Sequence, residues 1–404
     1  MKISIKKGAF IKESIIFCFV FIYPAINNYI IRIMSPILNI IGLNVVIKYF
    51  DYLILLLFFL FVGKNILKRC SLNDFIIYYF FILIIFFSSL FKINSEFSIN
   101  RAFDMIFLYL PYFIIGKALL CENLDLNIIR IIALVVLIMN LIYYFNIISL
   151  EETITEDRMG FAYNILPCVF INIYYMIRNT NLINILIGIL SIAFIFFQGT
   201  RGPILLIVVF TLMVLYKKYH TFKFLYYTSI ITVLFIFLIN TNTFSVYMDN
   251  TINYLNDNGI STRVLTMFQD GEISDDNGRN KIKEVIGKSI LEKPAIGYGL
   301  YGDRAVTKGN LPNYPEGIYA HSIIYELLCD FGIIFGTLIL LFIIIKILLL
   351  YKRCNFYNCL IILMIIAMGF FQLLLSNSFV QSKYFFALIG ILTSMNKQNH
   401  KLFL

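Results

Sequence analysis

Three cationic or titratable side chains stand where the sequence indicates a turn or the start of a helix. Arg201 lies in a turn of a few residues between two long apolar runs, and Gly202 follows it. Arg279 opens a run with apolar residues at helical spacing, and His321 comes just before another apolar run. An Arg guanidinium binds phosphate or diphosphate through parallel hydrogen bonds, and a His side chain titrates near neutral pH. These residue types are those of a diphosphate clamp and of a general base or proton relay.

Each of the three residues also has a plain structural interpretation. Arg201 could extend its charged end to lipid headgroups while its stem lies in apolar surroundings. Arg279 could be an ordinary solvated charge at a helix start, and His321 a structural hydrogen-bonding partner. The same holds for the acidic stretch at 151–158, which is most simply a solvated loop.

The apolar content of the chain predicts the elements that position these residues. Of the 404 residues, 60% are hydrophobic and 14% charged, whereas soluble domains carry about 25% charged residues. The apolar residues come in continuous blocks of roughly 17–22, the length of a helix that crosses ~30 Å of hydrocarbon. They lack the alternation of barrel strands. We therefore predict an all-α polytopic transmembrane bundle of about 12 spans.

The placement of Lys and Arg predicts the orientation of the bundle. With the N-terminus inside, 18 of the 33 basic residues fall in cytoplasmic segments and 7 in short outer segments. The other 8 lie in one long loop, which is exempt from the positive-inside rule. An even number of spans puts both termini of this multi-pass membrane protein in the cytoplasm. The first apolar run lacks a cleavage site and is expected to be an uncleaved span.

The predicted spans divide the chain into three parts. Transmembrane helices 1 to 9 occupy residues 1–242, a large extracytoplasmic loop 243–320, and helices 10 to 12 with a cytoplasmic tail 321–404. The spans are predicted at approximately 15–33, 49–66, 74–91, 104–120, 127–147, 161–178, 182–199, 203–219, 224–242, 324–349, 357–375 and 378–395.

The long loop carries signs of a folded segment. Its apolar face falls on one side of a helix, at Ile282, Val285, Ile286, Ser289 and Ile290. Residues 275–277 offer N-caps for this helix and Pro294 closes it. Gly297 and Gly299 then permit a tight turn or a close approach of backbone to ligand. After the loop, Glu326 and Asp330 share a helix face and must meet protein or water there.

These features together resemble the O-antigen polymerase and O-antigen ligase superfamily. Thr200-Arg201-Gly202 is similar to its small-Arg-Gly turn, and Arg279 with Pro294-x-x-Gly297-x-Gly299 to its Arg-helix-Pro-x-x-Gly-x-Gly stretch. His321-Ser322 with Asp330-x-Gly332 and Gly336 resembles its His-Asn and Glu-x-Gly-x-x-Gly segment. In this chain Ser322 stands where Asn is usual, Asp330 where Glu is common, and the final glycine pair is one residue further apart.

The resemblance implies a metal-independent, GT-C-like glycosyltransferase that needs no cofactor. Its donor would be an oligosaccharide on a polyprenyl diphosphate, held by Arg201 and Arg279, and its site loop would contain Gly297 and Gly299. His321 would be the catalytic residue that activates the acceptor hydroxyl. The favoured member is a polymerase that builds O-antigen, capsule or exopolysaccharide at the outer leaflet. The other expected partners are membrane lipid and, as an open point, a chain-length regulator protein.

Several alternatives stay open at this point. The O-antigen ligase, which moves finished glycan onto lipid A core, shares the same motifs. A transporter or flippase of lipid-linked sugars would also suit twelve spans, but the single long loop breaks any two-half symmetry. The seven cysteines and three histidines have no metal-ligand spacing. The net charge of +10 follows the membrane topology and does not indicate nucleic-acid binding.

Overall fold

The computed structural model describes most of the chain, and in the described residues it contains helices and no strands. The described residues are 13–41, 44–90, 101–119, 124–148, 158–198, 200–219, 226, 228–229, 249–254, 278–313, 318–354, 356 and 359–394. The predicted span at 224–242, the N-caps at 275–277 and the acidic stretch before Arg158 lie outside them, a few isolated residues excepted.

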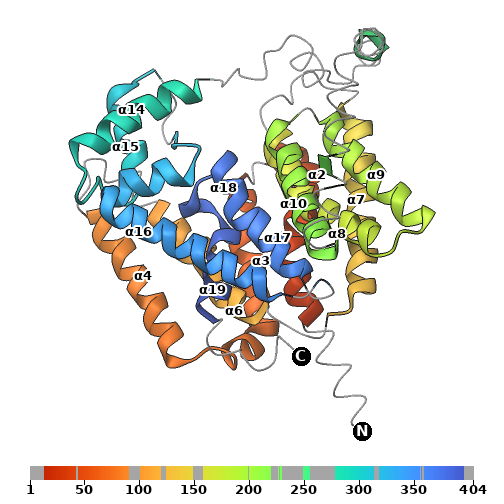
Figure 1. The fold of residues 1–404 in the computed structure, drawn as a ribbon, viewed down its shortest axis with the longest axis horizontal. Coiled ribbons are helices and arrows are strands. Elements are labelled where there is room, and N and C mark those ends of the chain that lie inside the picture. The colour runs from red at the N-terminus through yellow and green to blue at the C-terminus, as the bar shows by residue number, and fades with distance from the viewer. Residues whose placement is uncertain are drawn as a thin grey trace.

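The membrane helices form one bundle (Figure 1). In chain order it begins with α2 (Tyr23–Ile41), α3 (Asn44–Leu67), α4 (Leu72–Leu90), α6 (Pro111–Leu119), α7 (Leu126–Ile148), α8 (Arg158–Arg178), α9 (Leu182–Phe197) and α10 (Arg201–Tyr219), and it continues after the long loop with α16 (Ile323–Arg353). The chain ends in α17 (Leu360–Ile366), α18 (Gln372–Leu375) and α19 (Lys383–Ser394). Two π-helical turns are described, η1 (Met105–Tyr109) before α6 and η4 (Ala367–Phe371) between α17 and α18. A 3₁₀ turn, η5 (Phe379–Gln381), precedes α19.

Helix α8 lies at the centre of one half of the bundle. It contacts α2, α7, α9, α10 and α17, which surround it in Figure 1. It is apolar on almost all sides, the pattern expected of a helix enclosed by other helices. Its polar contacts include hydrogen bonds of 2.9 Å from Asn172 to Ser191 of α9 and from the Tyr174 hydroxyl to the Phe356 carbonyl oxygen. Because other helices enclose α8, its first turns are held in place at the end of the bundle where the candidate site lies.

Helices α6 and α19 pack backbone to backbone. A Cβ added at Gly116 would lie 2.2 Å from the carbonyl oxygen of Ala387, and one at Gly390 would lie 2.2 Å from that of Phe113. Small residues allow this approach, which replaces the hydrophobic driving force that lipid cannot supply between helices. The contact fixes α19, and with it the segment 372–382 that precedes it.

The prediction of an all-α polytopic membrane protein is confirmed, whereas the number of spans stays a prediction. Within the described residues, six helices are long and apolar enough to cross a membrane, or seven if the bent pair Glu13–Phe21 and Tyr23–Ile31 is one span. The six run over Tyr49–Leu67, Arg101–Leu119, Leu126–Tyr144, Met159–Arg178, Arg201–Tyr219 and Ile323–Arg353. Four further apolar helices are shorter, at Leu72–Ile85, Leu182–Phe196, Leu360–Leu375 and Lys383–Ser394.

Two helices of the long loop pack on the start of α16. The first, α14 (Arg279–Glu292), is the amphipathic helix predicted from the sequence, with Ile282, Ile286, Ser289 and Ile290 buried and Val285 partly buried. The second, α15 (Gly302–Asn310), was not predicted. Val306 of α15 and Cys329 of α16 complete the small apolar core that α14 covers. Both loop helices lie together beside the N-terminal part of α16 in Figure 1.

Candidate active site

The long helix α16 is broken at Gly332, and the glycine-containing segment of the loop fills the break. Gly332 has φ 76° and ψ 171°, a conformation that essentially only glycine adopts. The backbone N–H groups of Tyr298 and Gly299 donate to the carbonyl oxygens of Cys329 and Asp330, both at 2.8 Å. Across the break, Ile333 N–H donates to Pro294 at 2.7 Å. The loop therefore supplies backbone partners at the point where α16 turns.

Gly297 and Gly299 both have left-handed backbone conformations, with φ 71° and 76°. A Cβ on Gly297 would lie 2.5 Å from the backbone nitrogen of Gly332. The close approach that glycine permits here is therefore to the backbone of α16. Their predicted role as a substrate-binding loop stays a prediction.

Asp330 fixes the start of α15. Its two carboxylate oxygens accept hydrogen bonds from the backbone N–H groups of Tyr301, at 3.1 Å, and Asp303, at 3.3 Å. A carboxylate at a helix N-terminus satisfies free N–H groups and complements the helix dipole. Asp330 is fully buried. Its hydrogen bonds to the start of α15 explain how a carboxylate is tolerated so close to the bilayer.

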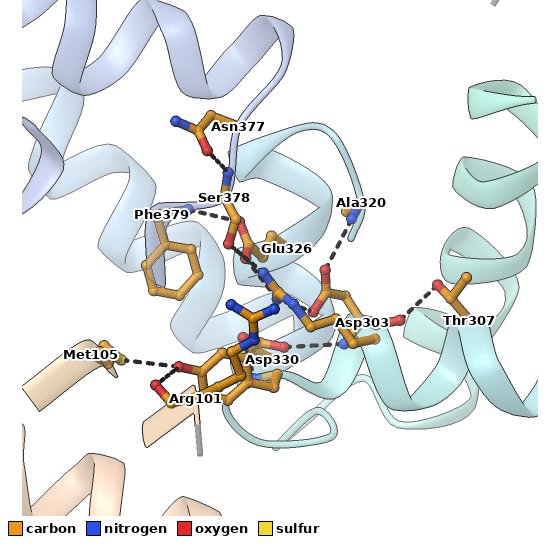
Figure 2. A network of polar contacts seen from close by, with 12 residues as sticks. Arg101, Met105, Asp303, Thr307, Ala320, Glu326, Asp330, Asn377, Ser378 and Phe379 are labelled. Carbon is orange, nitrogen blue, oxygen red and sulfur yellow. Dashed lines mark hydrogen bonds and ion pairs between the residues drawn. The ribbon is translucent and has the colours of Figure 1, made fainter. Parts of the chain in front are cut away.

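A buried cluster around Arg304 ties α15, α16 and the segment after α18 together (Figure 2). The Arg304 guanidinium contacts the carboxylates of Asp303 at 2.9 Å and Glu326 at 3.2 Å, and it donates to the Ser378 hydroxyl at 2.7 Å. Ser378 also hydrogen-bonds to Glu326, whose second oxygen accepts from the Phe379 backbone at 3.0 Å. Both acids are 0% exposed and Arg304 is 3% exposed.

The electrostatics of the cluster hold Arg304 in its charged form. Burial alone would lower the pKa of this guanidinium, but the carboxylates of Asp303 and Glu326 outweigh burial and raise it. The rings of Tyr301 and Tyr319 lie 5.1 and 5.7 Å from the guanidinium carbon, within the range of cation–π attraction. The buried charges are thus paired and hydrogen-bonded, which is the condition for tolerating them.

The cluster also fixes the backbone next to His321. The second carboxylate oxygen of Asp303 accepts a hydrogen bond of 2.9 Å from Ala320 N–H. His321 itself has φ 54°, in the left-handed region that costs energy for a residue with a Cβ. Its ring lies against that of Tyr319, with centroids 4.1 Å apart. Because strained backbone persists only where its surroundings hold it, the Asp303 contact is part of what sets the His321 position.

The imidazole of His321 is uncharged and can accept a proton. Burial, together with the nearby charges of Arg279 and Lys283, lowers the pKa of its imidazole to about 4. Its Nδ1 is buried and has no hydrogen-bond partner in the described residues. The ring is therefore neutral at physiological pH and has a nitrogen to offer to a bound group.

Arg279 and Arg201 approach the same end of α8 from two directions. Arg279 donates to the carbonyl oxygen of Leu375 at 3.5 Å, and the next residue, Ser376, contacts the Met159 sulfur at 3.7 Å. On the other side, a Cβ added at Gly202 would lie 2.0 Å from the Tyr163 hydroxyl and 3.7 Å from the Met159 methyl. Met159 and Tyr163 of α8 thus lie between the turn that contains Arg201 and the segment around Leu375 that Arg279 contacts.

Both arginines are the first residues of their helices and both are half-buried. A helix N-terminus carries partial positive charge and free N–H groups, so each guanidinium adds to a field that already favours an anion. Beside Arg201, both polar atoms of Gln198 and the Thr200 hydroxyl are buried without a partner in the described residues. Such groups cost free energy unless water or a ligand satisfies them.

Sequence reasoning missed Arg304, Asp303 and Ser378. Glu326 and Asp330 were identified as acids that must meet protein or water, and the structure confirms that both are buried against protein. The sequence gives only a weak indication that Arg304 is buried and paired: an acid and a base, Asp303 and Arg304, follow Gly302 in a polar stretch of the loop. No metal-binding group of three or more His, Cys, Asp or Glu occurs in the part of the chain that the structure describes.

Comparison with known proteins bears on residues 186–341, which match the O-antigen ligase family model. The matched segment contains Arg201, Arg279, His321 and the break in α16. No curated protein and no solved structure matches the chain. The family model does not separate ligases from polymerases. The match supports the resemblance read from the sequence: residues 186–341 of this multi-pass membrane protein are similar to the O-antigen ligase and polymerase superfamily, whose members are membrane glycosyltransferase-like enzymes.

Proposed function

We propose that the protein is a polymerase that joins polyprenyl-diphosphate-linked repeat units into a surface polysaccharide at the outer leaflet of the bacterial inner membrane. In this proposal Arg201 and Arg279 bind the diphosphate of the donor lipid. His321 receives the proton of the acceptor hydroxyl. The observation that carries the proposal is that two helix-opening arginines approach the same end of α8 and that one of them, Arg279, lies close enough to the neutral His321 to lower its pKa.

The proposed reaction is a single displacement at the sugar bound to the diphosphate. The acceptor hydroxyl oxygen attacks the anomeric carbon, the bond from that carbon to the diphosphate oxygen breaks, and the hydroxyl proton passes to His321. The leaving diphosphate takes the electron pair. Arg201 and Arg279 stabilise its developing charge, because fixed cations in a water-poor site act more strongly than in water. Their charge takes the role that a divalent metal has in other diphosphate sites.

The electrostatics also link donor binding to base strength. Two of the groups that lower the pKa of His321 are the cations Arg279 and Lys283. A diphosphate bound beside Arg279 would offset their charge and raise the pKa of His321 toward its ordinary value. The imidazole would then be a better proton acceptor when the donor is present than when the site is empty.

The test is a comparison of surface glycan and lipid-linked intermediates in a strain deleted for the gene. The strain is complemented with wild type, Arg201→Ala, Arg279→Ala or His321→Ala, with the amount of membrane protein measured for each. Lys288→Ala is the matched control, because Lys288 lies on α14 with Arg279 but its side chain is exposed and paired with Glu284. We expect glycan limited to a single repeat unit, restored by wild type and by the control only.

Other results would point to other functions. Long lipid-linked polymer that is not attached to its final acceptor would indicate the ligase. Repeat units retained on the cytoplasmic side would indicate a transporter. Full polymer from all three alanine variants would refute the assignment of the site.

A further inference from the structure

A polar cavity of about 210 Å³ lies inside the bundle beside the site. Its lining residues are mostly tyrosines, amides and charged side chains, an unusual set for the interior of a membrane protein. They include Tyr163, Gln372, Asn377, Lys383 and Tyr384. None of these residues is used in the chemistry proposed above.

Two buried polar atoms on the cavity wall have no hydrogen-bond partner in the described residues. They are the Gln372 side-chain oxygen and the Tyr384 hydroxyl. The two side chains are 4% and 5% exposed. Because buried polar groups are almost always satisfied, two unsatisfied groups on one cavity indicate that an occupant completes their hydrogen bonds.

The cavity shares its wall with the candidate active site. Tyr163 lines the cavity, and its hydroxyl would lie 2.0 Å from a Cβ added at Gly202, next to Arg201. The segment after η4 carries Gln372 and Asn377 on the cavity side, while Leu375 within it accepts the hydrogen bond of Arg279. An occupant of the cavity is therefore a close neighbour of groups bound at the arginines.

Both π-helical turns in the described residues reach the cavity. Tyr109 comes from η1 and Met368 from η4. A π-helical turn inserts one residue into a helix and redirects the side chains around it, and such turns are frequent at functional sites. Two irregular turns on one polar cavity favour a binding role over a packing defect.

The size and chemistry of the cavity limit its occupant. It is smaller than the ~300–1,000 Å³ pockets that hold drug-sized ligands, so it admits roughly one ring. The lining offers donors and acceptors together, with the Lys383 ammonium and the Asp51 carboxylate both present. Tyr23 and Asn27 already donate to Asp51, at 2.9 and 2.7 Å. A mixed lining of this kind fits a ring with several hydroxyl groups better than an apolar chain or a bare anion.

We propose that this cavity is a subsite for one sugar residue of the glycan substrate, bound through its hydroxyl groups. This inference rests on the proposed function. Gln372 and Tyr384 are specificity-determining residues in it, since each would bond to a sugar hydroxyl. The arginines and His321 act on the reacting bond, whereas the cavity selects which sugar is presented.

The experiment measures binding of a sugar without requiring turnover. The full-length protein in nanodiscs is titrated with the oligosaccharide that mild acid releases from the lipid-linked intermediates of the host strain. Binding is followed by saturation-transfer NMR. Gln372→Leu and Tyr384→Phe each remove one hydrogen-bonding group, so each should raise the dissociation constant about 2- to 10-fold.

Tyr175→Phe is the matched control for these variants. The Tyr175 hydroxyl is also buried and without a hydrogen-bond partner in the described residues, but Tyr175 is not among the residues that line the cavity. Its ring packs against Arg130. We expect this variant to bind the oligosaccharide like wild type. A variant that elutes as aggregate in size-exclusion chromatography is replaced by Gln372→Met, which keeps the side-chain volume.

The outcomes separate this inference from the proposed function. Weaker binding by both cavity variants with an unchanged control supports the subsite, whatever the alanine variants of the arginines do to glycan synthesis. An unchanged dissociation constant in both variants overturns it. No saturation transfer to wild type also overturns it and would mean that the cavity holds only water.

Discussion

Removing the positive charge of Arg304 is expected to destabilise the docking of the long loop on the bundle. The substitution Arg304→Met keeps most of the side-chain volume but leaves the carboxylates of Asp303 and Glu326 without their cation. Both acids are 0% exposed, so water cannot take its place. The Ser378 hydroxyl also loses a hydrogen bond of 2.7 Å.

The expected cost follows from the burial of the pair. Breaking a buried ion pair by removing one partner typically costs about 3–5 kcal/mol, because it leaves an uncompensated charge. An unfolding entropy of about 2.1 cal/mol/K per residue gives roughly 0.8 kcal/mol/K for a chain of this length, so the expected fall in Tm is about 4–6 °C. Neutralising the acids as well, with Asp303→Asn and Glu326→Gln, should recover most of that loss.

The assay is thermal unfolding of purified protein in detergent, followed by the fluorescence of a dye that reacts with newly exposed cysteines. Cys329 is fully buried beside α14, so it reports on loss of the loop contact. Lys288→Met is the control, since it breaks a surface pair whose side chains are 72% and 65% exposed. The reasoning is refuted if Arg304→Met changes Tm no more than the control, or if the triple variant is no more stable than the single one.

Two further predictions concern backbone strain and pH. Gly332→Ala should loosen the packing of the loop on α16, because Gly332 has φ 76° and the new Cβ would lie 2.6 Å from the Ala295 carbonyl oxygen. Limited proteolysis should therefore cut the loop faster in this variant than in the control Gly309→Ala, where nothing lies within 4 Å of the new Cβ. The pKa of His321 is about 4 in the folded protein against 6.5 in the unfolded chain. Between these two pH values the unfolded state binds more protons than the folded state. The free energy of unfolding therefore falls as the pH falls from 6.5 to about 4. His321→Gln should remove this part of the dependence in thermal melts between pH 7.5 and 4.5, and equal slopes for variant and wild type would contradict the assignment.

Much of the fold could be predicted from the sequence because its strongest signals are local. Apolar blocks of membrane-spanning length specify helices whatever their neighbours are. The face of α14 follows from the spacing of Ile282, Ile286 and Ile290. The end of α14 at Glu292 follows from Pro294. Its start at Arg279 agrees with the run that Arg279 opens in the sequence, and the N-cap is Gly278 with φ 80°.

The cluster around Arg304 could not be predicted, because its meaning lies in contacts between distant residues. Arg304 and Ser378 are 74 positions apart, and no period or motif links them. The short helix α15 could not be predicted either, because its start depends on the Asp330 carboxylate, which comes from another helix. Local sequence also could not show that Tyr163 and Gln372 face one cavity. Which polar residues meet inside a bundle depends on helix rotation, which only packing decides.

The structure gives a physical reason for the spacing of acid and glycine in the motif around α16. Asp330 holds the start of α15, and Gly332, two residues later, makes the break into which the loop backbone fits. Hydrogen bonds and a shared apolar core join α14, α15 and the break into one packed unit. Arg279 at one end of this unit and His321 at the other are therefore set relative to each other by the fold of the loop. Flexible side chains alone would not fix that distance, and the proposed diphosphate-binding arginine and base would need it fixed to act on one bond.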